Sequence, residues 1–215
     1  MKYKLVIFDM DGTILNTLTD IKNCINYALV QAGFPERSLE EVRKFVGNGL
    51  HKLVERAVPE GTDNAKIENV FSILLEYYKL HCSDNTKPYD GIPELIKELR
   101  VMGYKTAVVS NKADFAVKDL VDTFFEGLFD ISVGDREGIN KKPAPDSVYE
   151  VLRMLNIEKE NAVYIGDSEV DVATASNAGI DSIIVEWGFR DREFLEKQGA
   201  KVFVNTTKQL IDLLR

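Results

Sequence analysis

The sequence predicts an α/β protein whose core is a doubly wound parallel sheet, with an all-helical domain inserted into that core. Two observations support this prediction. Short runs such as residues 5–8 and 162–165 are apolar and contain β-branched residues, as strands do when a parallel sheet is buried on both faces. Residues 17–83 show only helical patterns, whereas strand and helix patterns alternate after Pro88.

The inserted domain is expected at residues 16–85, as a small bundle of four helices. The first helix ends at Gly33, and Ser38 with Glu41 forms a capping box at the start of the second. In the first, third and fourth helices the apolar residues share one helical face: Leu18, Ile21, Ile25, Leu29 and Ala32; Leu50, Leu53, Val54 and Ala57; and Ile67, Val70, Phe71, Leu74, Leu75 and Tyr78.

The core is expected to comprise residues 1–15 and 86–215, with hinges near Asn16 and Pro88. After the first strand, the pattern predicts a helix at 94–102, then a strand, a helix and a strand through Val133, a helix from about Asp146, strands at 162–165 and 182–185, a strand at 201–204 and a helix at 208–214. Alternation of this kind is typical of a doubly wound sheet.

Composition narrows the range of partners. The chain has 215 residues, of which 45% are hydrophobic, enough for one good core and a smaller second one. A net charge of -8 argues against nucleic acid as a partner, because such binding usually needs a basic patch.

No apolar run reaches the length of a membrane span and Met1 leads straight into the first strand, so a cytoplasmic protein is expected. A monomer and a homodimer both fit the sequence.

The two cysteines, Cys24 and Cys82, lie in helical surroundings without the spacing of metal ligands. We expect two reduced thiols, as is usual inside cells, and a disulfide between them is the alternative.

Two carboxylates, Asp9 and Asp11, follow the first strand and precede a Gly12-Thr13 turn. Because charged groups do not belong inside a buried strand, both should emerge at its carboxyl end, where open α/β sheets bind ligands. Residues two apart in a strand point the same way, so both are expected to face one site. The alternative is a simple turn in which Thr13 caps a helix.

Polar residues recur after later strands, which favours a site over a turn. Ser110, Asn111 and Lys112 follow one apolar run, and Gly166, Asp167 and Ser168 follow another, with Asp171 four residues beyond Asp167. Between them, Lys141 and Lys142 precede a Pro-Ala-Pro turn. Acids, a hydroxyl and a cation at the ends of neighbouring strands suit a metal-and-phosphate site.

In order, these motifs resemble all four motifs of the haloacid dehalogenase (HAD) superfamily, specifically its phosphatase branch with a helical cap. That family has Asp-x-Asp-Gly-Thr, a Ser or Thr after a strand, a Lys, and Gly-Asp followed by another acid. The matching positions here are Asp9 to Thr13, Ser110, Lys142 and Gly166 to Asp171, and the resemblance covers essentially the whole chain. It implies a Rossmann-like core and a cap that excludes water and selects the substrate.

The residue types suggest a role for each acid. A carboxylate can attack phosphorus to give an aspartyl phosphate, and Asp9 is the expected nucleophile. Mg²⁺ suits a site between two anions, with Asp9, Asp167 and, as the resemblance implies, the backbone carbonyl of Asp11 as ligands. The Asp11 side chain would then protonate the leaving oxygen and later deprotonate the attacking water.

Lys142 and the Ser110 hydroxyl are expected to bind the phosphoryl oxygens, together with backbone donors near Gly12 and Asn111. Asp171 is interpreted as an acid that orients Lys142 or metal-bound water. Lys141 and Lys112 are interpreted as solvated surface lysines, since only the Lys-Pro-x-Pro turn of the family selects Lys142.

Within the helical insertion, the loop Gly47-Asn48-Gly49 and the helix after it resemble the cap loop and helix of phosphoglycolate phosphatases. Glycine would let backbone donors approach a small anion closely. The alternative is a helix stop and restart. His51 is either an anion contact or an exposed side chain, and Arg56 is expected to pair with Glu60 at most.

The expected function is a Mg²⁺-dependent phosphomonoester hydrolase that acts through an aspartyl phosphate on a small organic phosphate, with phosphoglycolate as the leading candidate. A pyrophosphatase and a β-phosphoglucomutase-like phosphotransferase are alternatives, although residues 47–49 offer few side chains for a hexose. Asp11 and Asp167 argue against a dehalogenase, which needs neither a second acid nor a metal. A phosphate-binding or regulatory protein is the non-enzymatic alternative.

Overall fold

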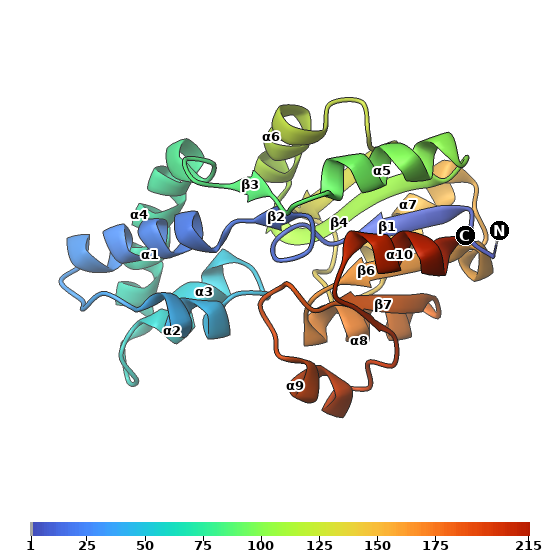
Figure 1. The fold of residues 1–215 in the computed structure, drawn as a ribbon. Coiled ribbons are helices and arrows are strands. Elements are labelled where there is room, and N and C mark those ends of the chain that lie inside the picture. Colours follow the sequence, from blue (N-terminus) through green and yellow to red (C-terminus); the bar gives the residue numbers. More distant parts are fainter. Residues whose placement is uncertain (1) are drawn as a thin grey trace. The chain divides into compact units, whose positions relative to one another are not determined.

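The structure is a computed structural model that describes residues 2–215 (Figure 1). Its internal contacts divide the chain into two compact units. One unit runs to Leu15 and resumes at Pro88, and the other is Asn16–Lys87. The chain crosses between them twice, where the short strands β2 (Leu15–Asn16) and β3 (Lys87–Pro88) pair in a two-stranded sheet.

The larger unit contains a six-stranded sheet with the order β5-β4-β1-β6-β7-β8. Every neighbouring pair is parallel. Its strands are β1 (Leu5–Phe8), β4 (Lys105–Ala113), β5 (Ile131–Asp135), β6 (Ala162–Gly166), β7 (Asp181–Val185) and β8 (Phe203–Val204). All four residues of β1 are fully buried, as expected for a central strand with helices on both faces.

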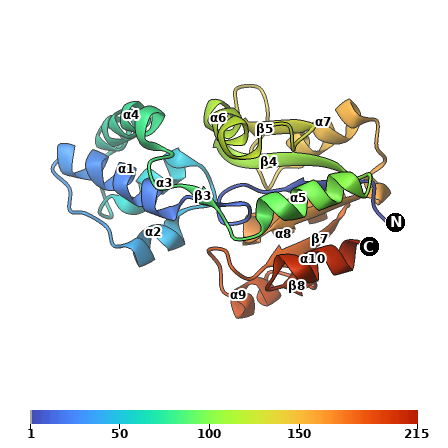
Figure 2. The ribbon, with the colours of Figure 1, turned by 45° about the horizontal axis from the view of Figure 1, so that its top comes forward.

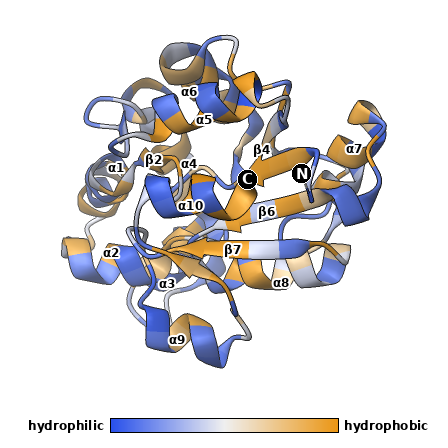
Figure 3. Ribbon diagram, turned by 45° about the vertical axis from the view of Figure 1, so that its right-hand side comes forward, coloured by the Kyte–Doolittle hydropathy of each residue, from blue (hydrophilic) through white to orange (hydrophobic). Residues whose placement is uncertain are grey.

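Helices cover both faces of this sheet, as Figure 2 shows. Alternate strand residues such as Val6 and Phe8 pack with α5 (Ile92–Val101), α6 (Asp114–Phe125) and α10 (Thr207–Leu214). Leu5 and Ile7 point the other way, toward α7 (Asp146–Leu155) and α8 (Glu169–Ala178). This arrangement confirms the α/β fold class. In Figure 3, the arrowhead half of strand β7 is hydrophobic, whereas the helices carry both colours.

Three details of the larger unit differ from the sequence prediction. A short helix, α9 (Arg192–Lys197), was not predicted, because its six residues are too few to show a helical period. Strand β8 begins at Phe203 instead of residue 201. Strand β4 continues to Ala113 through its polar end, and its register with β5 shifts between Val109 and Ala113.

The smaller unit contains four helices: α1 (Leu18–Gln31), α2 (Leu39–Phe45), α3 (Leu50–Ala57) and α4 (Asn64–His81). The capping box of Ser38 and Glu41 is present at the start of α2. Cys24 and Cys82 are both buried in this unit and are not joined in a disulfide. No helix between residues 2 and 215 combines the length and the apolarity needed to span a membrane.

Candidate active site

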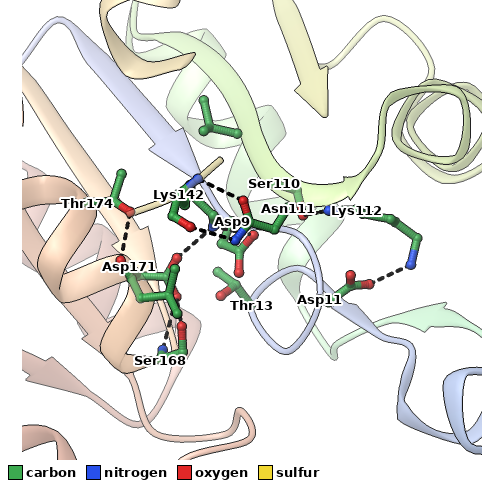
Figure 4. Close-up of polar contacts among 12 residues, drawn as sticks. Asp9, Asp11, Thr13, Ser110, Asn111, Lys112, Lys142, Ser168, Asp171 and Thr174 are labelled. Atoms are coloured by element: carbon green, nitrogen blue, oxygen red, sulfur yellow. Dashed lines mark hydrogen bonds and ion pairs between the residues drawn. The ribbon is translucent and has the colours of Figure 1, made fainter. Parts of the chain in front are cut away.

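The predicted polar residues of the larger unit gather at the carboxyl ends of β1, β4 and β6 (Figure 4). Asp9 follows β1, Ser110 belongs to the last part of β4, and Asp167 follows β6. Because β1 pairs with both β4 and β6, the three strand ends are neighbours. The order of strands thus brings together motifs that are far apart in the sequence.

The Lys142 ammonium lies at the centre of this cluster. Its Nζ is 2.9 Å from Oδ1 of Asp9, 2.8 Å from Oδ1 of Asp171 and 2.9 Å from the Tyr164 hydroxyl. Only 3% of the Lys142 side chain is exposed. Burial alone would lower the pKa of Lys142, but the charges of Asp171 and Asp9 raise it well above its usual value, so the ammonium stays charged.

Asn111 fixes the loop that carries Lys142. Its side-chain amide donates to the backbone carbonyl of Lys142 at 3.0 Å, and its side-chain oxygen accepts from the Lys142 amide at 2.8 Å. The sequence predicts a role for the Asn111 backbone at the phosphate. The paired side-chain bonds add a second role, in which Asn111 ties the end of β4 to the lysine loop.

Three buried carboxylates lie close together at this site, and two of them, Asp9 and Asp171, contact the ammonium. Asp9, Asp167 and Asp171 each offer an oxygen, and these oxygens all lie within 4.8 Å of one another. Burial and the charge of Asp171 raise the pKa of Asp9 to about 7. Burial and the charges of Asp171 and Asp9 likewise raise the pKa of Asp167 well above its ordinary value. The cluster holds more negative than positive charge, which a bound cation would relieve.

The three acids differ in how fully they are already engaged. Oδ2 of Asp171 accepts from the amides of Asp167 and Ser168 and from the Ser168 hydroxyl, and its Oδ1 pairs with Lys142. In contrast, Oδ1 of Asp9 accepts no well-directed hydrogen bond from residues 2–215, although it lies 2.9 Å from the Lys142 ammonium. Oxygen ligands with unused lone pairs suit Mg²⁺, so Asp9 fits a metal better than Asp171 does.

Asp167 is held by groups from distant parts of the chain. The Thr13 hydroxyl donates to its Oδ1 at 3.0 Å, and the Phe189 amide donates to its Oδ2 at 2.7 Å. Thr13 therefore orients a site carboxylate. The alternative suggested by the sequence was that Thr13 caps a helix. Gly188 was missed by the sequence analysis, yet a Cβ there would lie 2.2 Å from Cβ of Asp167. Nothing in the sequence around residue 188 marks this close approach.

Gly12 is required by the same packing. Its φ is +89°, and a Cβ at this position would lie 2.4 Å from Oδ2 of Asp167. A side chain would thus meet both an unfavourable backbone conformation and a collision with the carboxylate. The sequence predicts that Gly12 acts through its backbone, and this close approach to Asp167 explains why a glycine is needed there.

Asp11 and Lys112 are placed differently from the prediction. The Lys112 side chain is only 1% exposed, and its Nζ forms an ion pair with Oδ1 of Asp11 at 2.8 Å. The interpretation of Lys112 as a solvated surface lysine is therefore wrong. In Figure 4, the Asp11 side chain reaches toward Lys112, while Asp9 lies with Lys142.

Asp9 and Asp11 pair with different lysines, Lys142 and Lys112. Because β1 ends at Phe8 and the chain turns at Gly12, the directions of the two side chains do not follow from strand alternation, on which the sequence prediction was based. At the end of β4, the side chain of Asn111 bonds to Lys142, while that of Lys112 bonds to Asp11. Lys141, by comparison, is 46% exposed and pairs with Asp135, which agrees with a surface lysine.

The predicted cap residues belong to the smaller unit. Gly47, Asn48 and Gly49 connect α2 to α3, and both glycines have positive φ, +113° and +84°. Oδ1 of Asn48 accepts from Arg56 at 2.8 Å, and Arg56 also donates to the carbonyl of Phe45. Arg56 thus braces the loop, which corrects the expected pairing with Glu60.

The His51 ring contacts two carboxylates of the smaller unit. Its Nδ1 lies 3.1 Å from Oε1 of Glu55 and its Nε2 lies 2.8 Å from Oε1 of Glu68, so the ring links α3 to α4. Both ring nitrogens are therefore occupied by carboxylates of the same unit.

Comparison with known proteins agrees with the site. The family described as "Haloacid dehalogenase-like hydrolase" matches residues 6–185. The chain belongs to this family. It is a phosphatase, a conclusion that the four motifs, their arrangement around Lys142 and the phosphatases among its relatives all support.

Individual relatives cover almost the whole chain. A phosphoglycolate phosphatase from Aquifex aeolicus is 32% identical, with 86% of each chain covered. One from Chromobacterium violaceum is 29% identical, covering 99% of this chain and 96% of the relative. A crystal structure of a protein from Lactobacillus delbrueckii subsp. bulgaricus, assigned as a phosphoglycolate phosphatase, is 40% identical with a TM-score of 0.93, covering 98% of this chain and 97% of the other.

Proposed function

We propose that this phosphatase hydrolyses phosphoglycolate to glycolate and phosphate, with Mg²⁺, through an aspartyl phosphate on Asp9. One observation carries the mechanism: Asp9 is buried next to the Lys142 ammonium and the Asp167 carboxylate at the end of β1. The substrate is supported by the relatives named as phosphoglycolate phosphatases, which align with nearly the full chain.

Asp9 is the proposed nucleophile because its oxygen is presented at a strand end beside a fixed cation. An oxygen of Asp9 attacks phosphorus, a new O–P bond forms, and the ester O–P bond breaks as the glycolate oxygen leaves. Water then attacks the phosphorus of the aspartyl phosphate, releasing phosphate and regenerating Asp9. Dividing the displacement in this way makes each step easier than direct hydrolysis.

Lys142 and Ser110 are proposed to bind the phosphoryl oxygens, with backbone amides near Gly12 and Asn111. The Lys142 ammonium is held by Asp171 and Tyr164, so its position is set before substrate arrives. Donors fixed in advance stabilise the charge that develops on the phosphoryl group without having to reorganise.

The metal would be held by Asp9, Asp167 and the backbone carbonyl of Asp11. When bound, Mg²⁺ would neutralise charge between the phosphoryl group and the carboxylates. Asp171 is proposed to orient Lys142, since its oxygens are already engaged by Lys142 and by the loop after β6.

Asp11 is the proposed general acid and base. It lies two residues beyond the nucleophile, and 21% of its side chain is exposed. It would donate a proton to the leaving glycolate oxygen and later accept one from the attacking water.

Substrate selection is proposed for the smaller unit, in particular for Gly47, Asn48 and Gly49. We also propose residues 1–15 and 86–215 as the catalytic domain and 16–85 as its cap. The partner would be a small phosphorylated metabolite, and the protein a cytoplasmic monomer or homodimer.

The function can be tested by phosphate release from a panel of phosphoglycolate, pyrophosphate, hexose phosphates and nucleotides. Each compound is assayed with Mg²⁺ and with chelator, using wild type and Asp9→Asn. We expect phosphoglycolate to have the highest kcat/KM, and activity to disappear with chelator or with the substitution. Mg²⁺-dependent activity that is highest on another compound would keep the mechanism and reject the substrate. Full activity in Asp9→Asn would reject the mechanism.

A further inference from the structure

The loop at residues 186–190, between β7 and α9, is held at both of its ends (Figure 1). At its start, the Glu186 amide donates to the carbonyl of Val204 at 2.9 Å. At its end, the Arg190 guanidinium pairs with the carboxylate of Glu169 in α8 at 2.8 Å. The residues between these two anchors are therefore held in place by β8 and α8.

This loop constrains the Asp167 carboxylate by two routes. The direct route is the hydrogen bond from the Phe189 amide to Oδ2 of Asp167 at 2.7 Å. The indirect route begins at the indole of Trp187, whose Nε1 donates to the backbone carbonyl of Thr13 at 3.0 Å. It continues from the Thr13 hydroxyl to Oδ1 of Asp167, also at 3.0 Å. Each oxygen of this carboxylate thus accepts from a separate donor.

Thr13 is suited to act as the link in the indirect route. It is fully buried, and its amide donates to the carbonyl of Met10 at 3.2 Å. Because its carbonyl accepts from Trp187, Thr13 is held on both sides of its Cα, and this fixes the direction of its hydroxyl. Asp167 can still bind a metal ion, since a carboxylate has about four lone-pair sites and the two hydrogen bonds use only part of them.

We infer that Trp187 is a positioning residue for the proposed metal ligand Asp167, and that it acts through the Thr13 carbonyl. The inference rests on the proposed Mg²⁺ site and gives Trp187 no contact with the ion itself. Hydrogen bonds behind a metal ligand fix its orientation, and their loss weakens metal binding. Without the indole N–H, Thr13 and Asp167 are less constrained, so Mg²⁺ must order them as it binds and is bound more weakly.

The first test measures Mg²⁺ binding directly, by isothermal titration calorimetry. Trp187→Phe keeps an aromatic ring and removes the N–H, so we expect the dissociation constant for Mg²⁺ to rise roughly 3- to 10-fold, as for loss of one hydrogen bond. The control is Phe124→Leu, which trims a partly buried ring in α6 that packs on the same hydrophobic cluster as Trp187. It should leave the dissociation constant unchanged.

Kinetics separate positioning from a general loss of structure. Hydrolysis of p-nitrophenyl phosphate is used here, because it does not depend on the natural substrate. In Trp187→Phe, the Mg²⁺ concentration for half-maximal rate should rise by the same factor as the dissociation constant. At saturating Mg²⁺, kcat should stay close to that of wild type, because the bound ion itself orients Asp167. A lower kcat with an unchanged Mg²⁺ requirement would overturn the inference.

A double-mutant cycle tests the route through Thr13. Thr13→Val removes the hydroxyl that donates to Asp167 and should weaken Mg²⁺ binding by roughly 10-fold or more. Because Trp187 is inferred to act through Thr13, adding Trp187→Phe to Thr13→Val should weaken binding little further. Independent effects of the two substitutions, multiplying in the double variant, would contradict this route and overturn the inference.

A closer isostere keeps the test valid even if Trp187→Phe does not fold. Trp187 is the only tryptophan of the chain, so β-(3-benzothienyl)alanine supplied in place of tryptophan changes this position alone. The analogue keeps the shape of indole and replaces its N–H with sulfur, and the same rise in the dissociation constant is expected. If wild type binds Mg²⁺ and the analogue binds it equally well, the role of Trp187 is rejected and the metal site stands. If wild type binds no Mg²⁺, the proposed metal site is wrong and the inference falls with it.

Discussion

Tyr164 shows how a single residue of the sheet supports the proposed chemistry. Its hydroxyl donates to the carbonyl of Val109 at 2.8 Å and accepts from Lys142 at 2.9 Å, so it links β6 and β4 to the site ammonium. Burial raises the pKa of Tyr164 well above its usual value, which keeps the hydroxyl protonated and able to donate. A phenylalanine would keep the ring and lose both bonds.

Replacement of Tyr164 by Phe should therefore lower both stability and activity. We expect the free energy of unfolding to fall by about 1–3 kcal/mol, because a buried carbonyl and an ammonium each lose a partner. We also expect kcat to fall more than KM changes, because Lys142 would be less well positioned. Urea denaturation and steady-state kinetics measure the two effects.

The matched control for this prediction is Tyr149→Phe. Its hydroxyl makes one exposed contact with the carbonyl of Asn177, at 3.3 Å. Stability should change by less than about 0.5 kcal/mol. If Tyr164→Phe behaves like this control in both assays, the hydroxyl does not position Lys142.

At the scale of elements, Asp20 in the first turn of α1 binds the chain where it returns after α4. It accepts from the Asn85 amide at 2.9 Å, from the Thr86 amide at 2.7 Å and from the Thr86 hydroxyl at 2.7 Å. Asp20 is only 1% exposed. A buried carboxylate that accepts several N–H and O–H groups replaces the water they would otherwise bind.

Substitution of Asp20 by Asn keeps the shape and replaces one acceptor oxygen with an NH₂ group that faces other donors. We expect the free energy of unfolding to fall by about 1–3 kcal/mol. Asp84→Asn serves as the control, because Asp84 makes an exposed pair with His81 and should contribute little. Equal losses in the two variants, measured by urea denaturation, would contradict the assignment.

Asp130 stabilises the region where α5, β4 and β5 meet. Burial raises its pKa, but the hydrogen bond from the Thr106 amide and the charges of Lys105 and Arg100 together lower it below its ordinary value. A carboxyl whose pKa is lowered by folding adds stability above its unfolded pKa. That stability is lost as pH falls through the folded pKa.

Asp130→Asn should therefore cost stability at neutral pH and progressively less in acid. We expect a cost of about 1–3 kcal/mol at pH 7, typical of hydrogen bonds to a charged group, and a cost that decreases as pH falls below the unfolded pKa of about 4. Urea denaturation across this range measures the trend. Asp212→Asn, at a 53% exposed side chain paired with Arg215, is the control. A cost for Asp130→Asn that does not vary with pH would contradict the role of its charge.

Viewed over the whole molecule, the parts that the sequence predicted depend on local patterns. Apolar runs located the strands, helical periods located the four helices of the smaller unit, and polar strand ends located Asp9 and Asp167. Because parallel strands end at one edge of the sheet, topology alone then brought these groups together.

The parts that were not predicted depend on geometry that local patterns do not encode. Lys112 lies in the part of β4 beyond Val109, where the register with β5 shifts, and its side chain is buried there. Asp9 and Asp11 pair with different lysines, and β1 ends before either acid, so strand alternation could not predict these pairs. Gly188 comes close in space to Asp167, although 21 positions separate the two in the chain (188 − 167 = 21).

The central claim, a phosphoryl group carried on Asp9, is tested most directly by a rapid acid quench during a single turnover of phosphoglycolate with Mg²⁺. Mass spectrometry of the peptide that contains Asp9 should show one added phosphoryl group at early times, localised to Asp9 by fragmentation and lost as turnover finishes. Asp9→Asn should show none. Consumption of the ester with no phosphoryl group on Asp9 at any time, or with the group on another residue, would contradict the account.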